Sequence, residues 1–392
     1  MSTGSNGQSA GAGALLAILR DGRARTRGEL AQLTGLSRST VSQRLDGLVA
    51  ERWVVAAEDP ISSGGRPAAI FAFNEGARVV LAADLGATRA RLAVLDLGMT
   101  VLAERAAELP VDRGPEPTLE WVATAFRELL AEGGRDLDHV CGAGVGLPGP
   151  VEHASGRPVN PPIMPGWDGF DVPGWLGARL GAPVLADNDV NIMALGEHWA
   201  AGPEVDHLIF IKIGTGIGCG IISGGRLHRG AQGAAGDVGH IRVPASEAPC
   251  RCGNTGCLEA VAGGASMAAQ LRAAGVEAHG SRDVVALMRA GDLHATRLVR
   301  QAGREVGAVM ASIVNFFNPS LIVLGGDVAE AGEQVLAGVR ETIYSRSLPL
   351  ATQHLGIRSS RLGGRAGVVG AAVMVVDHVL APDAIDQAFE HH

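Results

Sequence analysis

One stretch of the chain reads Gly239-His240-Ile241-Arg242-Val243, followed shortly by Cys250-Arg251-Cys252-Gly253-Asn254-Thr255-Gly256-Cys257-Leu258-Glu259. One imidazole and three thiols supply four ligands, the number that a closed tetrahedral zinc site needs. Gly253 and Gly256 let the backbone bend so that the thiols can converge on one ion. A disulfide or a chance cluster would be an unusual use of the only five Cys in the chain. We therefore predict a structural zinc site, with no position left for a reactive water, formed by His240, Cys250, Cys252 and Cys257.

The composition of the whole chain of 392 residues limits the possible architectures. This length suits two or three domains, and 46% hydrophobic residues provide an ample core. A single Lys (Lys212) against 32 Arg indicates a compositional bias. The first apolar run, Ala10–Leu19, is short and no basic residue precedes it, so we expect neither a signal peptide nor a membrane span. No membrane partner is expected, and the predicted location is the cytoplasm, where thiols stay reduced.

Charge separates the N-terminal region from the rest. Residues 1–74 carry 8 Arg and 6 acidic residues, whereas residues 75–392 carry 25 basic and 35 acidic residues. A basic head on an acidic body indicates that the head alone meets a polyanion.

Two short helices are predicted in this head. Thr26 and Glu29 have the spacing of a capping box at the start of the first helix, which runs to Thr34. Gly35 makes the turn, and Ser37 caps a second helix over residues 38–49. Apolar side chains share one face of this second helix and polar ones the other, as in a helix-turn-helix. The residues predicted to contact DNA here are Ser37, Arg38, Ser39, Thr40, Gln43 and Arg44.

A wing is predicted to follow the second helix. Strand-like runs at 53–55 and 69–73 flank Ser62-Ser63-Gly64-Gly65-Arg66-Pro67, in which Arg66 is expected to enter a minor groove. An ordinary helical hairpin with a solvated polar face is the alternative. The order of helix, Gly turn, capped helix and wing favours double-stranded DNA as the partner.

Two Gly/Thr hairpins mark the body. The first joins strands at 79–84 and 89–95 through Gly86 and Thr88, and the second joins strands on either side of Gly214-Thr215-Gly216. Either one alone is compatible with a simple hairpin turn. Two of the same kind indicate a duplicated α/β domain with phosphate-binding loops facing a cleft.

Between the hairpins, a strand over 184–187 delivers Asn188 and Asp189 to its end, and a helix follows. An Asp at this place is suited to take a proton from a sugar hydroxyl. Asn and Asp also serve as helix N-caps. Spacing alone leaves both interpretations open.

Taken in order, these motifs resemble the ROK family, named for repressors, open reading frames and kinases. The residues that carry the resemblance are Asp84-x-Gly86-x-Thr88, Asn188-Asp189, Gly214-Thr215-Gly216-x-Gly218, Gly239-His240, the cysteine motif through Glu259, and Gly325-Gly326. The resemblance implies an α/β fold in which a winged helix-turn-helix precedes an actin-like (ribonuclease H-like), two-lobed sugar-kinase body. The implied division is a DNA-binding domain over 1–76, a first lobe over 77–195 completed by a C-terminal helix over 366–392, and a second lobe over 196–365.

The resemblance also implies roles for individual residues. The family's sugar contacts fall on Asn160, Asn188, Asp189, Asp237, His240 and Glu259. Its nucleotide and phosphate contacts fall on Asp84, Gly86, Thr88, Gly214, Thr215, Gly216, Gly325 and Gly326. Asp189 would be the catalytic base in a kinase. The segments 159–162 and 165–167, the latter containing Trp167, resemble the family's pocket lining.

Departures from the family pattern bear on catalysis. Asp237 stands where kinases usually have Glu, Ala87 replaces a second Gly, and Asp327 follows Gly325-Gly326 where a third Gly is typical. A carboxylate near an anionic nucleotide disfavours ATP by about 1 kcal/mol or more.

Two hypotheses follow. The first is a regulator, most simply a repressor of carbohydrate metabolism, that binds operator DNA through its head and a sugar or sugar-phosphate effector through its body. It would act as a homodimer or a dimer of dimers on palindromic sites. The second is an active ATP- and Mg²⁺-dependent hexose or N-acetylhexosamine kinase that carries a DNA-binding domain.

Overall fold

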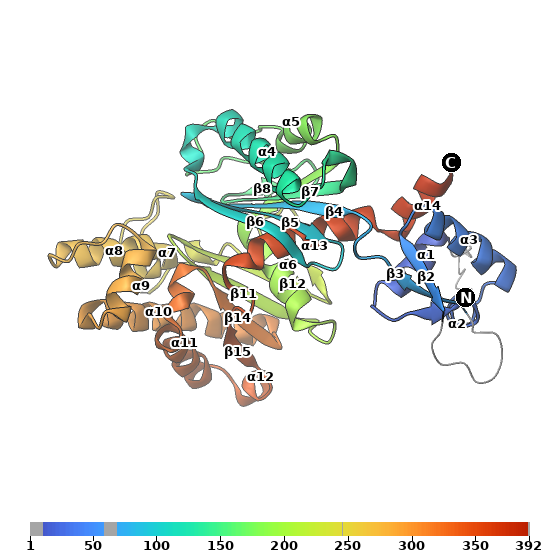
Figure 1. Cartoon of the computed structure of the whole chain (residues 1–392). Coiled ribbons are helices and arrows are strands. Elements are labelled where there is room, and N and C mark those ends of the chain that lie inside the picture. Colours follow the sequence, from blue (N-terminus) through green and yellow to red (C-terminus); the bar gives the residue numbers. More distant parts are fainter. Residues whose placement is uncertain (1–10, 59–68, 245, 391–392) are drawn as a thin grey trace.

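The computed structural model describes residues 11–58, 69–244 and 246–390. A small N-terminal head lies at one end of the molecule, and a larger body built on two sheets makes up the rest (Figure 1). The α/β class and the division into head and body agree with the fold class predicted from the sequence.

The described residues of the head form three helices and a three-stranded sheet of order β1-β3-β2. Its elements are α1 (Ala12–Leu19), β1 (Arg25–Thr26), α2 (Arg27–Thr34), α3 (Arg38–Ala50), β2 (Val54–Glu58) and β3 (Ala69–Phe73). The predicted capping box between Thr26 and Glu29 is present, and Gly35 ends α2 with a φ of 72°. These local features explain why the two helices begin and end where they do.

The tip of the predicted wing lies outside the described residues. Strands β2 and β3 pair antiparallel on either side of it, with Val54 opposite Phe73. Arg66 belongs to the segment 59–68, which is not described.

The two sheets of the body share one topology. The first has the order β10-β7-β4-β5-β6 and the second β13-β12-β11-β14-β15. In each, three consecutive strands form an antiparallel meander and two later strands add in parallel beside the first. The strands of the first sheet are β4 (Val79–Leu85), β5 (Arg89–Asp96), β6 (Val101–Glu108), β7 (Val140–Leu147) and β10 (Val184–Asn188). Those of the second are β11 (Leu208–Ile213), β12 (Ile217–Ser223), β13 (Arg226–Leu227), β14 (Leu321–Gly325) and β15 (Gly356–Ser359). The repeated order supports a duplicated unit.

Helices cover both faces of each sheet. The outer face of the first sheet packs on α4 (Pro115–Glu132) and α5 (Val172–Leu180). The outer face of the second packs on α7 (Leu258–Ala262), α8 (Gly264–Ala273), α9 (Ser281–Arg289), α10 (Leu293–Phe317) and α11 (Glu333–Arg346). Short elements complete the described chain: β8 (Val151–Glu152), β9 (Arg157–Pro158), α12 (Pro349–Thr352) and the 3₁₀ turns η1 (Val111–Arg113), η2 (Leu137–His139), η3 (Val238–His240), η4 (Asp327–Ala331) and η5 (Gly363–Arg365).

Two helices fill the space between the sheets. Helix α6 (Asp189–Ala201) contacts β11 and β12 of the second sheet, and α13 (Ala366–Val379) packs on β4 and β7 of the first. Where the two helices cross, a Cβ on Gly370 would lie 1.6 Å from the carbonyl oxygen of Ile192, and one on Gly196 would lie 2.2 Å from that of Ala366. Only glycine fits at such a crossing, so the backbones themselves are in contact. The predicted boundary at 195/196 falls within α6.

The C-terminal segment differs from the single helix predicted over 366–392. It forms α13 and, after a break at Leu380–Ala381, α14 (Pro382–Glu390), because a proline cannot continue the helix. Helix α14 packs on α1 of the head instead of on the first sheet, as Figure 1 shows at the red end of the chain.

No single helix in the described parts of the chain is long and apolar enough to cross a membrane. The bent pair Gly363–Val379 and Pro382–Phe389 meets the length and composition criteria only when taken together.

Candidate functional site

The end of β10 places Asn188 and Asp189 in different roles. The Asn188 side chain caps α6 by accepting from the N–H groups of Val190 (2.9 Å) and Asn191 (3.3 Å), and it donates to the carbonyl of Gly149. Asp189 is the first residue of α6, and its carboxylate makes an ion pair of 2.5 Å with the ammonium of Lys212 on β11. The capping role therefore belongs to Asn188, and Asp189 keeps its carboxylate for contacts between the two sheets.

A second ion pair beside it was not predicted from the sequence. Asp187 is 1% exposed, and its carboxylate accepts from Arg229 at 2.8 Å, while its other oxygen accepts from Asn191 at 2.8 Å. Arg229 follows β13 of the second sheet and thus ties that sheet to β10 of the first. No short-range pattern in the sequence links these two positions.

The predicted phosphate residues lie on both sheets. Gly86 closes the first hairpin by donating to the carbonyl of Arg89, and Thr88 on this turn is exposed. Gly214 closes the second hairpin by donating to the carbonyl of Gly216. Gly326, which follows Gly325 at the end of β14, has a φ of 84°, and a Cβ there would lie 2.6 Å from the carbonyl oxygen of Ile213. The loop after β14 and the Gly214-Thr215-Gly216 hairpin are therefore in contact.

Asp84, at the end of β4, has an unusual electrostatic environment. Burial raises the pKa of its carboxyl to about 7, the charge of Asp189 acts in the same direction, and Lys212 and Arg91 oppose both. Its oxygens lie against the backbone of Gly367 at the start of α13. Asp84, Asp189 and Lys212, which we call the intersheet cluster, are thus coupled by charge.

Asp327 is held by residues of α9. Its carboxylate accepts from the hydroxyl of Ser281 at 2.8 Å and from Arg282 at 3.3 Å. These contacts fix one carboxylate at the loop where the sequence departs from the family pattern.

The segment from His240 to Cys257, which we call the His/Cys loop, brings the four predicted metal ligands together. Their ligand atoms lie within 4.8 Å of one another, with Cys252 Sγ to Cys257 Sγ at 3.7 Å and Cys250 Sγ to His240 Nδ1 at 3.7 Å. Two sulfurs each about 2.3 Å from one tetrahedral ion would lie about 3.8 Å apart. This donor set and spacing fit a structural metal ion.

Gly256 makes the convergence of these ligands possible. Its φ is 73°, and a Cβ there would lie 2.4 Å from the carbonyl oxygen of Ser246. The adjacent Cys257 forms an isolated β-bridge with Arg242. This bridge brings the end of the loop back beside the residues that follow His240.

Three predicted sugar contacts border this loop. His240 turns its other ring nitrogen, Nε2, towards Asp237 Oδ1 at 3.9 Å. Glu259 accepts from the N–H of Ile217 at 3.1 Å and lies against Gly216. Glu259 therefore joins the His/Cys loop to the Gly214-Thr215-Gly216 hairpin.

The segment upstream gives a mixed picture. Asn160 is exposed with a φ of 43°, and its N–H donates to Asp168 at 2.7 Å. Trp167 is fully buried and donates to the carbonyl of Val111 at 2.9 Å, so it belongs to the core of the first sheet.

The polar face of α3 agrees with the prediction only in part, because Thr40 and Arg44 are half-buried. Ser37 caps the helix by accepting from the N–H of Thr40 at 3.1 Å, and Val41, Leu45 and Leu48 are buried. The side chains of Arg38, Ser39 and Gln43 are exposed. Arg44 is half-buried, and its Nη1 has no hydrogen-bond partner within the described ranges.

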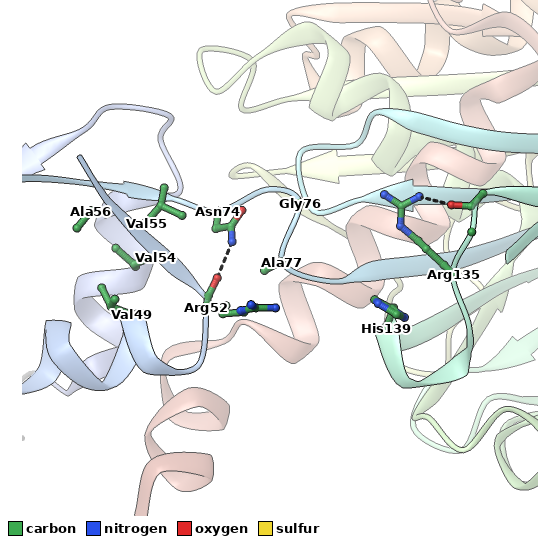
Figure 2. A pocket seen from close by; sticks show the side chains of 12 residues that line it. Val49, Arg52, Val54, Val55, Ala56, Asn74, Gly76, Ala77, Arg135 and His139 are labelled. Carbon is green, nitrogen blue, oxygen red and sulfur yellow. Dashed lines mark hydrogen bonds between the residues drawn. The ribbon is translucent and has the colours of Figure 1, made fainter. Parts of the chain in front are cut away.

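A hollow of about 710 Å³ lies at the junction of head and body. Figure 2 shows Arg52 and Asn74 on one side of it and Arg135 and His139 on the other. The side chain of Asn74 donates to the carbonyl of Arg52 at 2.9 Å. None of the lining residues belongs to the predicted sugar or phosphate sites, so we assign this hollow to the connection between the two parts.

The chain matches models of known families over both parts. Residues 80–378 match the ROK family and residues 11–60 match the MarR family. A xylose repressor from Caldicellulosiruptor bescii is 28% identical over 382 residues, covering 94% of this chain and 95% of that protein.

Solved structures agree with these matches. A ROK family transcriptional regulator, a homologue of the E. coli MLC protein, superposes with a TM-score of 0.81 at 26% identity, covering 95% of this chain and 96% of that chain. A ROK family glucokinase from Streptomyces griseus, solved with glucose and AMPPNP, gives a TM-score of 0.65 at 30% identity, covering 76% of this chain and 98% of that chain.

Proposed function

The chain belongs to the ROK family, and we propose that it is a sugar-responsive transcriptional regulator, acting as a repressor of carbohydrate metabolism in the cytoplasm. One observation carries the proposal: a MarR-type winged head with an exposed polar recognition face is joined to a sugar-kinase-like body. The similarity to a xylose repressor extends over both parts, whereas the similarity to the glucokinase is confined to about three quarters of the chain.

The head supplies the DNA contacts in this proposal. The exposed side chains Arg38, Ser39 and Gln43 lie in the first turns of α3, where they would reach base edges in a major groove. Gln is suited to bidentate pairing with adenine. The N–H groups at the start of α3 favour a phosphate nearby. Arg66 of the wing is proposed to contact the adjacent minor groove.

The body supplies the effector site. We propose that a sugar contacts Asn188, Asp189, Asp237, His240 and Glu259, with Asn160 at the edge. We propose zinc as the ion held by His240 and the three cysteines, because one imidazole and three thiolates suit that metal. With Nδ1 on the ion, Nε2 of His240 would face the sugar, so the metal would fix the wall of the site.

A symmetric assembly is part of the proposal. Repressors with one winged head per chain read two half-sites as dimers, and closed two-fold symmetry is the commonest arrangement of homo-oligomers. We therefore propose a homodimer, or a dimer of dimers, on a palindromic operator.

An active sugar kinase is the second candidate function. The glucokinase similarity and the presence of Asp189 at the end of β10 favour it. ATP and Mg²⁺ would then be required. The residues present do not fit this pair well, because Lys212 already holds the carboxylate of Asp189 and Asp327 lies on the loop after β14.

One set of experiments tests both candidate functions, the regulator and the kinase. Operator sites are selected from random duplex DNA, and the effect of a panel of hexoses, pentoses, N-acetylhexosamines and their phosphates on binding is measured. We expect one class of sugar to change operator affinity, and Gln43→Ala to lose about 1–3 kcal/mol of discrimination at one base pair. Gln301→Ala, an exposed glutamine on α10 of the body, is the matched control.

A failure to select any sequence would refute the regulator. Sugar-dependent ATP consumption by the same protein, together with that failure, would establish the kinase.

A further inference from the structure

Lys212 is the only lysine among 392 residues, and it lies at the centre of the intersheet cluster. Its ammonium is 2.5 Å from Asp189 Oδ2, and the two side chains are 23% and 6% exposed. The alkyl chain passes Gly214, since a Cβ there would lie 3.7 Å from Lys212 Cε. The ammonium is thus held at the base of the Gly214-Thr215-Gly216 hairpin.

Three carboxylates act on the charge of Lys212, and one of them, Asp189, is in direct contact with it. Burial acts to lower the pKa of Lys212, but Asp189 and Asp84, with a smaller contribution from Asp327, outweigh it and raise the pKa above its ordinary value. The ammonium is therefore charged throughout the neutral range. A buried charge is tolerated when it is paired in this way, and removing one partner leaves the others uncompensated.

The position of this charge conflicts with phosphoryl transfer. Such a site needs a divalent cation, held by a carboxylate, beside the phosphate groups, and a second carboxylate free to receive the hydroxyl proton. Here one oxygen of Asp189 is already occupied by an ammonium. A second, divalent cation next to Asp84 and Asp189 would have to overcome repulsion from Lys212 in a poorly hydrated region.

We propose that Lys212 is a built-in counter-cation that takes the place of the divalent metal, so that the body binds its sugar without metal or nucleotide. This inference rests on the proposed sugar-binding function of the same site and makes Lys212 a specificity-determining residue. Asp84 and Asp189 are then a pair of carboxylates whose charge is compensated in part by a cation from within the chain. The effector is consequently a ligand whose binding needs no phosphate–metal bridge.

The test is titration of the purified, zinc-loaded protein with Mn²⁺, followed by the paramagnetic spectrum of the free ion. We expect the wild type to bind no Mn²⁺ at the intersheet cluster below millimolar concentration. Lys212→Met, which keeps the length of the side chain and removes its charge, should gain a site at least tenfold tighter. The double variant Lys212→Met/Asp84→Asn should lose that site again, and Lys212→Arg should behave like the wild type.

Two outcomes would overturn the proposal. One is tight Mn²⁺ binding by the wild type that Asp84→Asn abolishes, a result that requires no Lys212 variant to fold. The other is equal Mn²⁺ binding by the wild type and a folded Lys212→Met.

A second measurement separates this inference from the proposed function. The sugar that alters operator binding should bind the wild type equally well with Mg²⁺ and with Mg²⁺ removed by a chelator too weak to strip the zinc. A requirement for Mg²⁺ would refute the role of Lys212 while leaving the regulator intact. Loss of operator binding by the wild type would refute the regulator, whatever the Mn²⁺ titration shows.

Discussion

Four side chains from one loop meet at distances that suit a single ion, although the loop has little regular structure. His240 lies in a 3₁₀ turn, and Cys257 directly precedes α7. Residues 246–255 of this loop are exposed or half-buried, so this part buries little apolar surface and we expect the metal to contribute a large part of its stability.

The first prediction tests this role. Purified protein should contain about one equivalent of zinc, and Cys252→Ser should contain well under one and unfold at a lower temperature, because one of the four ligands is lost. Cys141→Ser is the control, since Cys141 lies on β7 away from the cluster and donates to the carbonyl of Val79. Metal analysis by mass spectrometry and a thermal melt provide the measurements. Metal-free wild-type protein that is as stable as the zinc-loaded form would exclude a structural zinc.

Asp84 leads to a prediction about pH. Its pKa is about 7 in the folded protein against an ordinary value of 3.8. Between these values the folded chain keeps a proton that the unfolded chain loses. The loss of folding stability caused by ionising this buried carboxyl is therefore absent below about pH 4. It grows as the pH rises and levels off above about pH 7.

Asp84→Asn should remove this cost. As the pH rises from about 4 to 7, the free energy of unfolding of the wild type should fall by about 1–3 kcal/mol relative to that of the variant. Urea unfolding at a series of pH values is the measurement, with Asp138→Asn at an exposed position as the control. A constant difference between wild type and Asp84→Asn over this range would show that the carboxyl is not destabilised by burial.

At the scale of elements, the contact between α14 and α1 connects the last described helix to the first. The N–H of Gly13 donates to Asp386 of α14 at 2.8 Å, and nearby Arg20 pairs with Asp377 near the end of α13 at 2.8 Å. A Cβ on Gly13 would lie 2.2 Å from the backbone oxygen of Pro382. Because that atom belongs to the backbone, it cannot move aside as a side chain would.

Gly13→Ala should therefore push α14 away from the head. We expect a loss of about 1–3 kcal/mol in the stability of the docked head, as for other overpacked positions. The matched control is Gly28→Ala in α2, where a Cβ would meet only Thr26 Oγ1 at 3.8 Å. Hydrogen exchange of the α1 amides reports the docking. Equal protection in the two variants would mean that α14 does not hold the head.

The elements that could be predicted from the sequence are those whose determinants are local. The Thr26–Glu29 capping box, Gly35 and Ser37 each act within a few residues, so the helices of the head follow from short patterns. The docking of α14 depends on partners more than 350 positions apart, and no local pattern encodes it. Composition drew attention to Lys212, but its meaning required the pairing with Asp189 across two sheets.

At the scale of the whole molecule, α13 forms a continuous path from the intersheet cluster to the head. Its first two turns lie against Asp84 and cross α6 backbone to backbone, and α14 continues from its far end onto α1 (Figure 1). Packed interfaces of this kind shift between discrete arrangements and do not deform continuously. A sugar that changes how Asp84 and Asp189 face each other would therefore also change the position of α13.

The last prediction is that sugar and operator binding are coupled along this path. A sugar titration should give affinities for the free and the DNA-bound protein that differ by about 5- to 150-fold, the equivalent of about 1–3 kcal/mol. Linkage requires the sugar to change operator affinity by the same factor. Asp189→Ala should bind operator but lose the response to sugar, whereas Gly13→Ala should bind sugar normally and show weaker coupling, since it disturbs only the far end of the path. Identical sugar affinities in the free and DNA-bound wild type would mean that the body does not regulate the head, and the kinase would then become the better account of the chain.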